Sequence, residues 1–154
     1  MSASTPTHTT VHEEERRRAS PVIWQSTIIA GEVAILGTII VNLIIRNIGM
    51  RIFDIPAAFD PLAGAQPTIV MTVIYTLGAL VAFTLLRYFG GRPWRTFAII
   101  AAVAFVLSFL PMLSLRGQDG TTAAGIGILI TMHIASLIVI VGSIYILAGR
   151  EVRR

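Results

Sequence analysis

Four long apolar runs dominate the chain, and they limit its fold more than any other feature. Short connections separate them, and these connections together with the two tails hold every charged residue except Glu32. At about 1.5 Å per residue, a helix of about 19 to 26 residues is long enough to cross roughly 30 Å of hydrocarbon. The runs cover about residues 22–45, 68–86, 97–115 and 123–148.

The composition agrees with membrane spans. Of 154 residues, 55% are apolar and only 13% are charged, and the mean hydropathy is +0.79. A soluble domain of this size needs more charge to cover its surface. We therefore predict an all-α, four-helix transmembrane bundle over residues 22–148. A disordered tail (1–21) is expected before it and a short basic tail (149–154) after it.

The basic residues predict the orientation of the bundle. All twelve are Arg, which is typical of GC-rich bacterial coding sequences. Nine lie in the two tails and in the connection between the second and third runs, and three lie in the other two connections. Because cytoplasmic segments carry the excess of basic residues, both termini are predicted to lie in the cytoplasm, with the bundle in a bacterial plasma membrane.

Several function classes find no support in the sequence. The net charge of +4 comes from Arg residues that flank apolar runs, so lipid headgroups, and not nucleic acid, are their expected partners. The absence of Cys excludes disulfides and thiolate metal sites. His8 and His12 share a helical spacing but lack a third ligand, so no metal and no cofactor are predicted. Known catalytic motifs are missing, although one axial bond from His133 to a tetrapyrrole stays open.

Glu32 is the most unusual residue of the apolar runs, because a charged side chain is costly in hydrocarbon. When depth is counted from the predicted cytoplasmic ends, all four helices carry a polar residue close to one level near the bilayer midplane. We expect this midplane polar layer to comprise Glu32, Thr76, Ser108, His133 and Ser136.

The first run also has a polar side. Gln25, Glu32, Asn42 and Arg46 fall within an arc of about 100° on a helix. Since lipid is a poor environment for a carboxylate, this arc is expected to face the bundle interior. His133 is the expected partner of Glu32, and the two could share one proton.

Three roles for Glu32 stay open at this point. A neutral, hydrogen-bonded carboxyl would lock the register of the helices. A titrating carboxyl would be linked to proton movement or ligand binding. A carboxyl at a subunit interface would bind another chain.

A family resemblance rests on the deep acidic residue of the first run followed by Asn42-Leu43, a Pro-containing first connection, Ser108-x-x-Pro111 and Met132-His133. Over about residues 22–148 the chain resembles an uncharacterised bacterial family of small four-helix integral membrane proteins. The resemblance implies the fold and implies no activity.

The sequence therefore predicts a small, non-enzymatic, multi-pass membrane protein. Its expected role is that of an accessory or assembly component of a membrane complex, and its expected partners are the bilayer and either further copies or other subunits. The alternative is a small transporter or proton-coupled carrier that uses a Glu32–His133 pair. An intramembrane enzyme would need a second acid, base or metal ligand near His133, and the sequence offers none.

Overall fold

The structure, a computed structural model, describes residues 8–89, 92–115 and 117–148, with side chains from Gln25 onward. Within these ranges every regular element is helical. The elements are α1 (His8–Ile52), α2 (Asp60–Ala63), α3 (Ala65–Phe89), α4 (Pro93–Leu107), α5 (Leu110–Ser114), α6 (Ala123–Ser143) and the π-helical turn η1 (Ile144–Ala148).

Four segments are long and apolar enough to cross a membrane, which confirms the predicted all-α, four-helix membrane fold. These segments are Gln25–Ile52, Ala65–Phe89, Pro93–Ser114 and Ala123–Ala148. The last one coincides with the predicted fourth run, where Thr122 caps α6 by accepting a hydrogen bond from the backbone N–H of Gly125.

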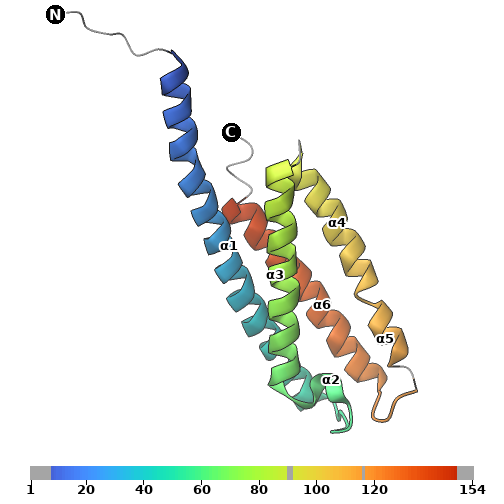
Figure 1. Ribbon diagram of the computed structural model, residues 1–154. Helices are drawn as coiled ribbons and strands as arrows, with labels where there is room; N and C mark the ends of the chain where they lie inside the picture. Colours follow the sequence, from blue (N-terminus) through green and yellow to red (C-terminus); the bar gives the residue numbers. More distant parts are fainter. Residues whose placement is uncertain (1–7, 90–91, 116, 149–154) are drawn as a thin grey trace, which may run out of the picture.

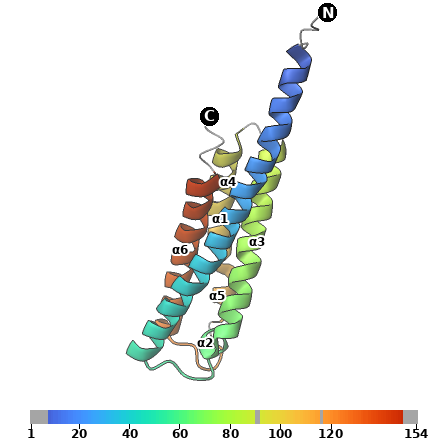
Figure 2. The same cartoon turned by 90° about the vertical axis from the view of Figure 1, so that its left-hand side faces the viewer.

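Helices α1, α3 and α6 form the centre of the bundle. Figure 1 shows α6 crossing obliquely behind α3, from beside α1 at one end to beside α5 at the other. Figure 2 looks onto α1, which lies in front with α6 and α3 on its two sides. Helix α4 packs against α3 and α6 and lies farthest from α1 (Figures 1 and 2).

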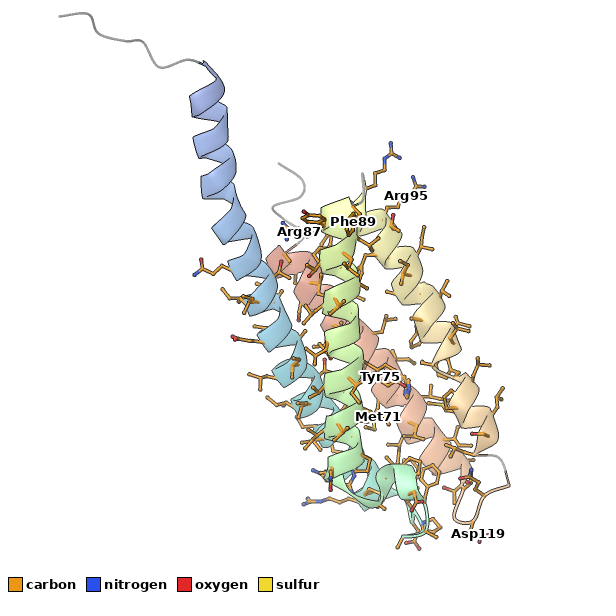
Figure 3. The ribbon with its side chains drawn as sticks, in the orientation of Figure 1. Met71, Tyr75, Arg87, Phe89, Arg95 and Asp119 are labelled. Atoms are coloured by element: carbon orange, nitrogen blue, oxygen red, sulfur yellow. The ribbon has the colours of Figure 1, made fainter. Side chains whose placement is uncertain are left out.

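The bundle has two distinct ends. At the N-terminal end, α1 enters the bundle, η1 finishes, and α3 connects to α4 (Figure 1). Figure 3 places Arg87, Phe89 and Arg95 at this end and Asp119 at the opposite end, which we call the α2 end. Both ends of the described chain therefore lie on the N-terminal side of the membrane domain, as the even number of spans requires.

Two apolar clusters fill the bundle, one near each end. The cluster at the N-terminal end comprises Ala30, Phe83, Phe97, Ile140, Ile144 and Ala148. The cluster at the α2 end comprises Phe59, Leu62, Met112, Ile128, Leu129 and Met132. Phe59 is 2% exposed and lies so close to Gly125 that a Cβ there would approach its ring to 2.9 Å. The loop after α1 thus folds back and closes the α2 end.

Helix α1 contacts its neighbours through a stripe of small residues. Ala30 and Ala34 are fully buried. A Cβ on Gly31 would lie 2.6 Å from Leu80 of α3, and one on Gly49 would lie 2.5 Å from Ile128 of α6. Small side chains let the helix backbones approach closely, which is a common basis of helix association in membranes.

Helix α1 extends beyond the predicted first run at both ends. It starts at His8, so the prediction of a disordered tail is wrong for His8–Pro21; the other tail residues, 1–7 and 149–154, lie outside the described residues. The Glu- and Arg-rich segment before the run consists of good helix formers, and an existing helix propagates at little cost. At its other end α1 continues to Ile52 instead of stopping near residue 45, because no Pro follows residue 45 until Pro56.

The third span is broken close to Pro111. Helix α4 ends at Leu107, and α5 resumes at Leu110. Pro111 has no N–H to donate to the carbonyl of Leu107, and its ring would clash with that carbonyl in a straight helix. The helix is therefore interrupted about one turn before Pro111.

Candidate functional site

The buried polar centre of the bundle is organised around Asn42 of α1, which is 4% exposed. Its Nδ2 donates to Thr72 Oγ1 of α3 at 3.2 Å and to Ser136 Oγ of α6 at 2.9 Å. The Ser136 hydroxyl also lies 2.7 Å from the Met132 carbonyl and 3.3 Å from Asn42 Oδ1, so the Met132 carbonyl is its closer acceptor. One side chain thereby links all three central helices.

A threonine stripe on α3 continues this polar centre. Thr68, Thr72 and Thr76 are all buried and follow one another at four-residue spacing. Thr76 Oγ1 donates to the Thr72 carbonyl at 2.7 Å, within its own helix. We call Asn42, Thr72, Thr76 and Ser136 the Asn42 cluster.

Thr38 lies one turn before Asn42 on the buried side of α1 and is 1% exposed. Its Oγ1 has no hydrogen-bond partner among the described residues. A buried hydroxyl without a partner costs about 1–3 kcal/mol of stability. The interior therefore holds one unsatisfied polar atom beside a well-bonded cluster.

Arg46 connects α1 to the short helix α2 through hydrogen bonds. Its Nε and Nη2 donate to the Leu62 carbonyl at 3.1 and 2.7 Å, and its Nη1 donates to Asn47 Oδ1 at 3.1 Å. Leu62 belongs to the short helix α2, whose carbonyls have few partners within so short a segment. Arg46 thus holds α2 against the end of α1.

The predicted arc of α1 is divided by the packing. Asn42 lies inside the bundle and Arg46 is half-buried, but Glu32 and Gln25 are exposed. The expectation that the whole arc faces the interior is wrong. Glu32 lies about 80° around the helix from Asn42, and that rotation carries it out of the buried stripe.

The depth of Glu32 also differs from the prediction. Near the N-terminal end, Arg87 Nη1 donates to Thr27 Oγ1 at 3.2 Å, and Arg46 marks the α2 end. About 19 residues separate Thr27 from Arg46, which is about 28 Å of helix and close to the thickness of the hydrocarbon core. Glu32 lies about 7–8 Å from the Thr27 level and about 21 Å from the Arg46 level, so it is closer to the N-terminal end than to the middle of this segment.

Glu32 and His133 do not form the predicted pair. The contact of Asn42 with Ser136 sets the level of α1 against the antiparallel α6. Relative to this contact, Glu32 lies about 15 Å toward the N-terminal end and His133 about 4–5 Å toward the α2 end. The two side chains are therefore about 20 Å apart along the bundle.

His133 has its own surroundings near the α2 end. Its Nδ1 lies 2.8 Å from the Leu129 carbonyl. Because a carbonyl only accepts, Nδ1 carries a proton and donates. The ring centroid is 5.8 Å from that of Phe109. Within the described part of the chain no three His, Cys, Asp or Glu residues gather as a metal site.

Ser108 is also outside the Asn42 cluster. Its Oγ donates to the Phe105 carbonyl at 2.6 Å, one turn back in its own chain, where α4 ends. Of the predicted midplane layer, Ser136 bonds to Asn42 and Thr76 bonds to the Thr72 carbonyl, whereas Glu32, Ser108 and His133 lie at separate places. The single layer expected from depth alone is therefore wrong.

Comparison with known proteins places the chain in a family. A family model described as a family of unknown function, DUF6069, matches residues 18–150. The chain belongs to this family. No curated protein and no solved structure matches it. Membership confirms the predicted resemblance to an uncharacterised family of small four-helix membrane proteins.

Thr72 and Thr38 belong to the interior, although neither was predicted from the sequence. A usable signal was present in both helices. The Thr residues of α3 recur every four positions, and the small residues of α1 follow a helical spacing that leads to Asn42. Together these rows mark the faces of α1 and α3 that meet.

Proposed function

We propose that this chain is a non-enzymatic accessory or assembly component of a bacterial membrane complex, and that it binds its partner within the bilayer through the outward face of α1. The observation that carries the proposal is Glu32, which is exposed on that face within the apolar segment Gln25–Ile52 and lies about 7–8 Å from the Thr27 level. An ionised side chain costs roughly 2.5–3.5 kcal/mol at the centre of a span on insertion scales and less toward its ends, so Glu32 carries part of this cost. A hydrogen-bonding group on another chain would lower that cost.

The neighbours of Glu32 strengthen the case for a binding face. Ile28, Ile29 and Leu36 surround it and are 57%, 49% and 61% exposed. Apolar side chains with one polar group at their centre can pack against another helix and hydrogen-bond to it at once. The same residues facing lipid alone would leave the carboxyl without a partner.

The bundle interior supports a structural role for its polar residues. Asn42, Thr72 and Ser136 hydrogen-bond across three helices, and Thr76 bonds within α3. Such bonds fix register, and each contributes about 0.5–2 kcal/mol. We assign the Asn42 cluster to folding and the outward face of α1 to binding.

The carrier hypothesis depends on a Glu32–His133 pair, and these two residues lie far apart. It requires Glu32 and His133 on one path, but Glu32 is exposed and lies about 20 Å from His133 along the bundle. We therefore prefer binding over transport.

We propose that both termini lie in the cytoplasm and that the membrane is the plasma membrane. Arg87, Arg92 and Arg95 lie toward the N-terminal end, whereas Arg46 and Arg51 lie toward the α2 end. This distribution follows the excess of basic residues on cytoplasmic sides. A reporter enzyme that is active only outside the cytoplasm should stay inactive when it is fused after residue 154. An active fusion would show that the orientation is the opposite of the one proposed.

The binding role is tested by placing a photo-crosslinking amino acid at Leu36 and illuminating native membranes. We expect an adduct with a membrane-embedded chain, identified by mass spectrometry. The adduct should disappear in Glu32→Leu and persist in Tyr75→Phe, a matched control on the exposed side of α3. If residue 36 gives lipid adducts only, with or without Glu32, the proposal is wrong.

A further inference from the structure

The outward face of α1 has the spacing of a helix–helix seam. Gln25, Ile29, Glu32 and Leu36 follow one another at steps of four, three and four residues, and all four are exposed. This alternation keeps side chains on one narrow face and is typical of two helices that wrap around each other with a left-handed twist. In Figure 2 no other element covers the front of α1.

We infer that the occupant of this face is a second copy of the chain, which packs α1 against α1 in a parallel, two-fold symmetric dimer. The inference rests on the proposed function, since it assumes that the outward face of α1 binds protein. It goes further by naming the first partner and the residues that meet.

Symmetry supplies the matching polar group. Two copies inserted in the same direction are related by a two-fold axis along the membrane normal. Such an axis brings each Glu32 to its twin at the same depth, and each Gln25 to its twin one heptad away. A foreign helix would need its own polar group at the same depth, but a second copy carries one necessarily.

The chemistry of the facing groups is self-complementary. A carboxyl that holds its proton donates one hydrogen bond and accepts others, so it can bond to the carboxyl of the twin Glu32. The amides of two Gln25 side chains also donate and accept. A polar residue within an otherwise apolar seam sets the register of paired helices, and Glu32 would do so here.

The exposed faces of the other helices are less suited to bind a second copy. On α6, Thr131 is exposed, but its Oγ1 already donates to the Gly127 carbonyl at 2.8 Å. The middle of α4 exposes apolar side chains such as Ile99 and Val103. On α3, the exposed Tyr75 lies midway along the helix (Figure 3). Its hydroxyl costs less free energy in hydrocarbon than a carboxyl does.

The test exploits the absence of Cys from the chain. Purified Leu36→Cys protein is reconstituted alone into phosphatidylethanolamine–phosphatidylglycerol vesicles and oxidised. We expect disulfide-linked dimers from Leu36→Cys, and few from the controls Leu77→Cys on α3 and Thr131→Cys on α6. Adding Glu32→Leu should lower the association constant roughly fivefold to thirtyfold, whereas Glu32→Gln, which keeps a donor and an acceptor, should change it by less than about threefold.

The outcomes separate the inference from the proposed function. Dimers through position 77 or 131, but not 36, would overturn the inference, because another face would then bind the second copy. If Leu36→Cys stays monomeric in pure vesicles while position 36 crosslinks to a different chain in native membranes, the dimer is wrong and the proposed function holds. If position 36 contacts no protein in either setting, both fail.

Discussion

Asn42 and Glu32 lie on the same helix, ten residues and about 80° apart, yet their surroundings differ completely. Asn42 is buried and bonds to Thr72 and Ser136 on two other helices. Glu32 is exposed among apolar side chains. A polar group inside the bundle is a folding contact, whereas one on its outer face needs a partner from outside the monomer.

The sharpest test of this contrast removes the buried amide of Asn42. Asn42→Leu keeps the number and branching of the side-chain heavy atoms but leaves Thr72 and Ser136 without their donor. We expect a loss of about 1–3 kcal/mol of stability, measured as a lower midpoint of thermal unfolding in detergent. An unchanged midpoint would mean that the Asn42 cluster does not hold the helices together.

A matched pair of glycines extends the comparison to packing. Gly49→Ala places a methyl group against Ile128, whereas a methyl group at Gly78 would lie in open space. We expect Gly49→Ala to destabilise the protein by about 1–3 kcal/mol through overpacking. Gly78→Ala should stabilise it by up to about 1 kcal/mol, because Ala is the better helix former. Similar unfolding midpoints for the two variants would contradict the buried stripe of α1.

Thr38 distinguishes a bonded polar group from an unbonded one inside the same helix. Thr38→Val replaces the unpartnered hydroxyl by a methyl group of similar shape. We expect a gain of about 1 kcal/mol in the same unfolding assay, since no hydrogen bond is lost. A loss as large as that of Asn42→Leu would instead reveal a hydrogen bond to this hydroxyl in solution.

The smallest effect is expected at Glu32 in the isolated monomer. Glu32→Leu removes no hydrogen bond that the described residues make, so monomer stability in detergent should change by less than about 0.5 kcal/mol. Dilution into excess detergent, with the monomer checked by light scattering, separates this measurement from dimerisation. A clear destabilisation of the monomer would show that Glu32 makes a contact within the monomer, as Asn42 does.

Predictions of depth from the sequence failed for an identifiable reason. An apolar run does not mark where its helix leaves the membrane, and α1 passes its predicted end by seven residues to Ile52. Arg46 was expected to end the span, but α1 continues through it, and its side chain donates hydrogen bonds to the Leu62 carbonyl. Levels counted from such ends were therefore too uncertain to bring Glu32 and His133 together.

The sequence by itself determined the fold class, the number of spans and the fourth span, because length, hydropathy and helix caps are local properties. Only the tertiary structure decided which edge of the polar arc faces inward. That choice depends on the rotation of α1 about its axis, and close contacts such as those of Gly31 with Leu80 and Gly49 with Ile128 set this rotation. The same contacts that bury Asn42 leave Glu32 outside.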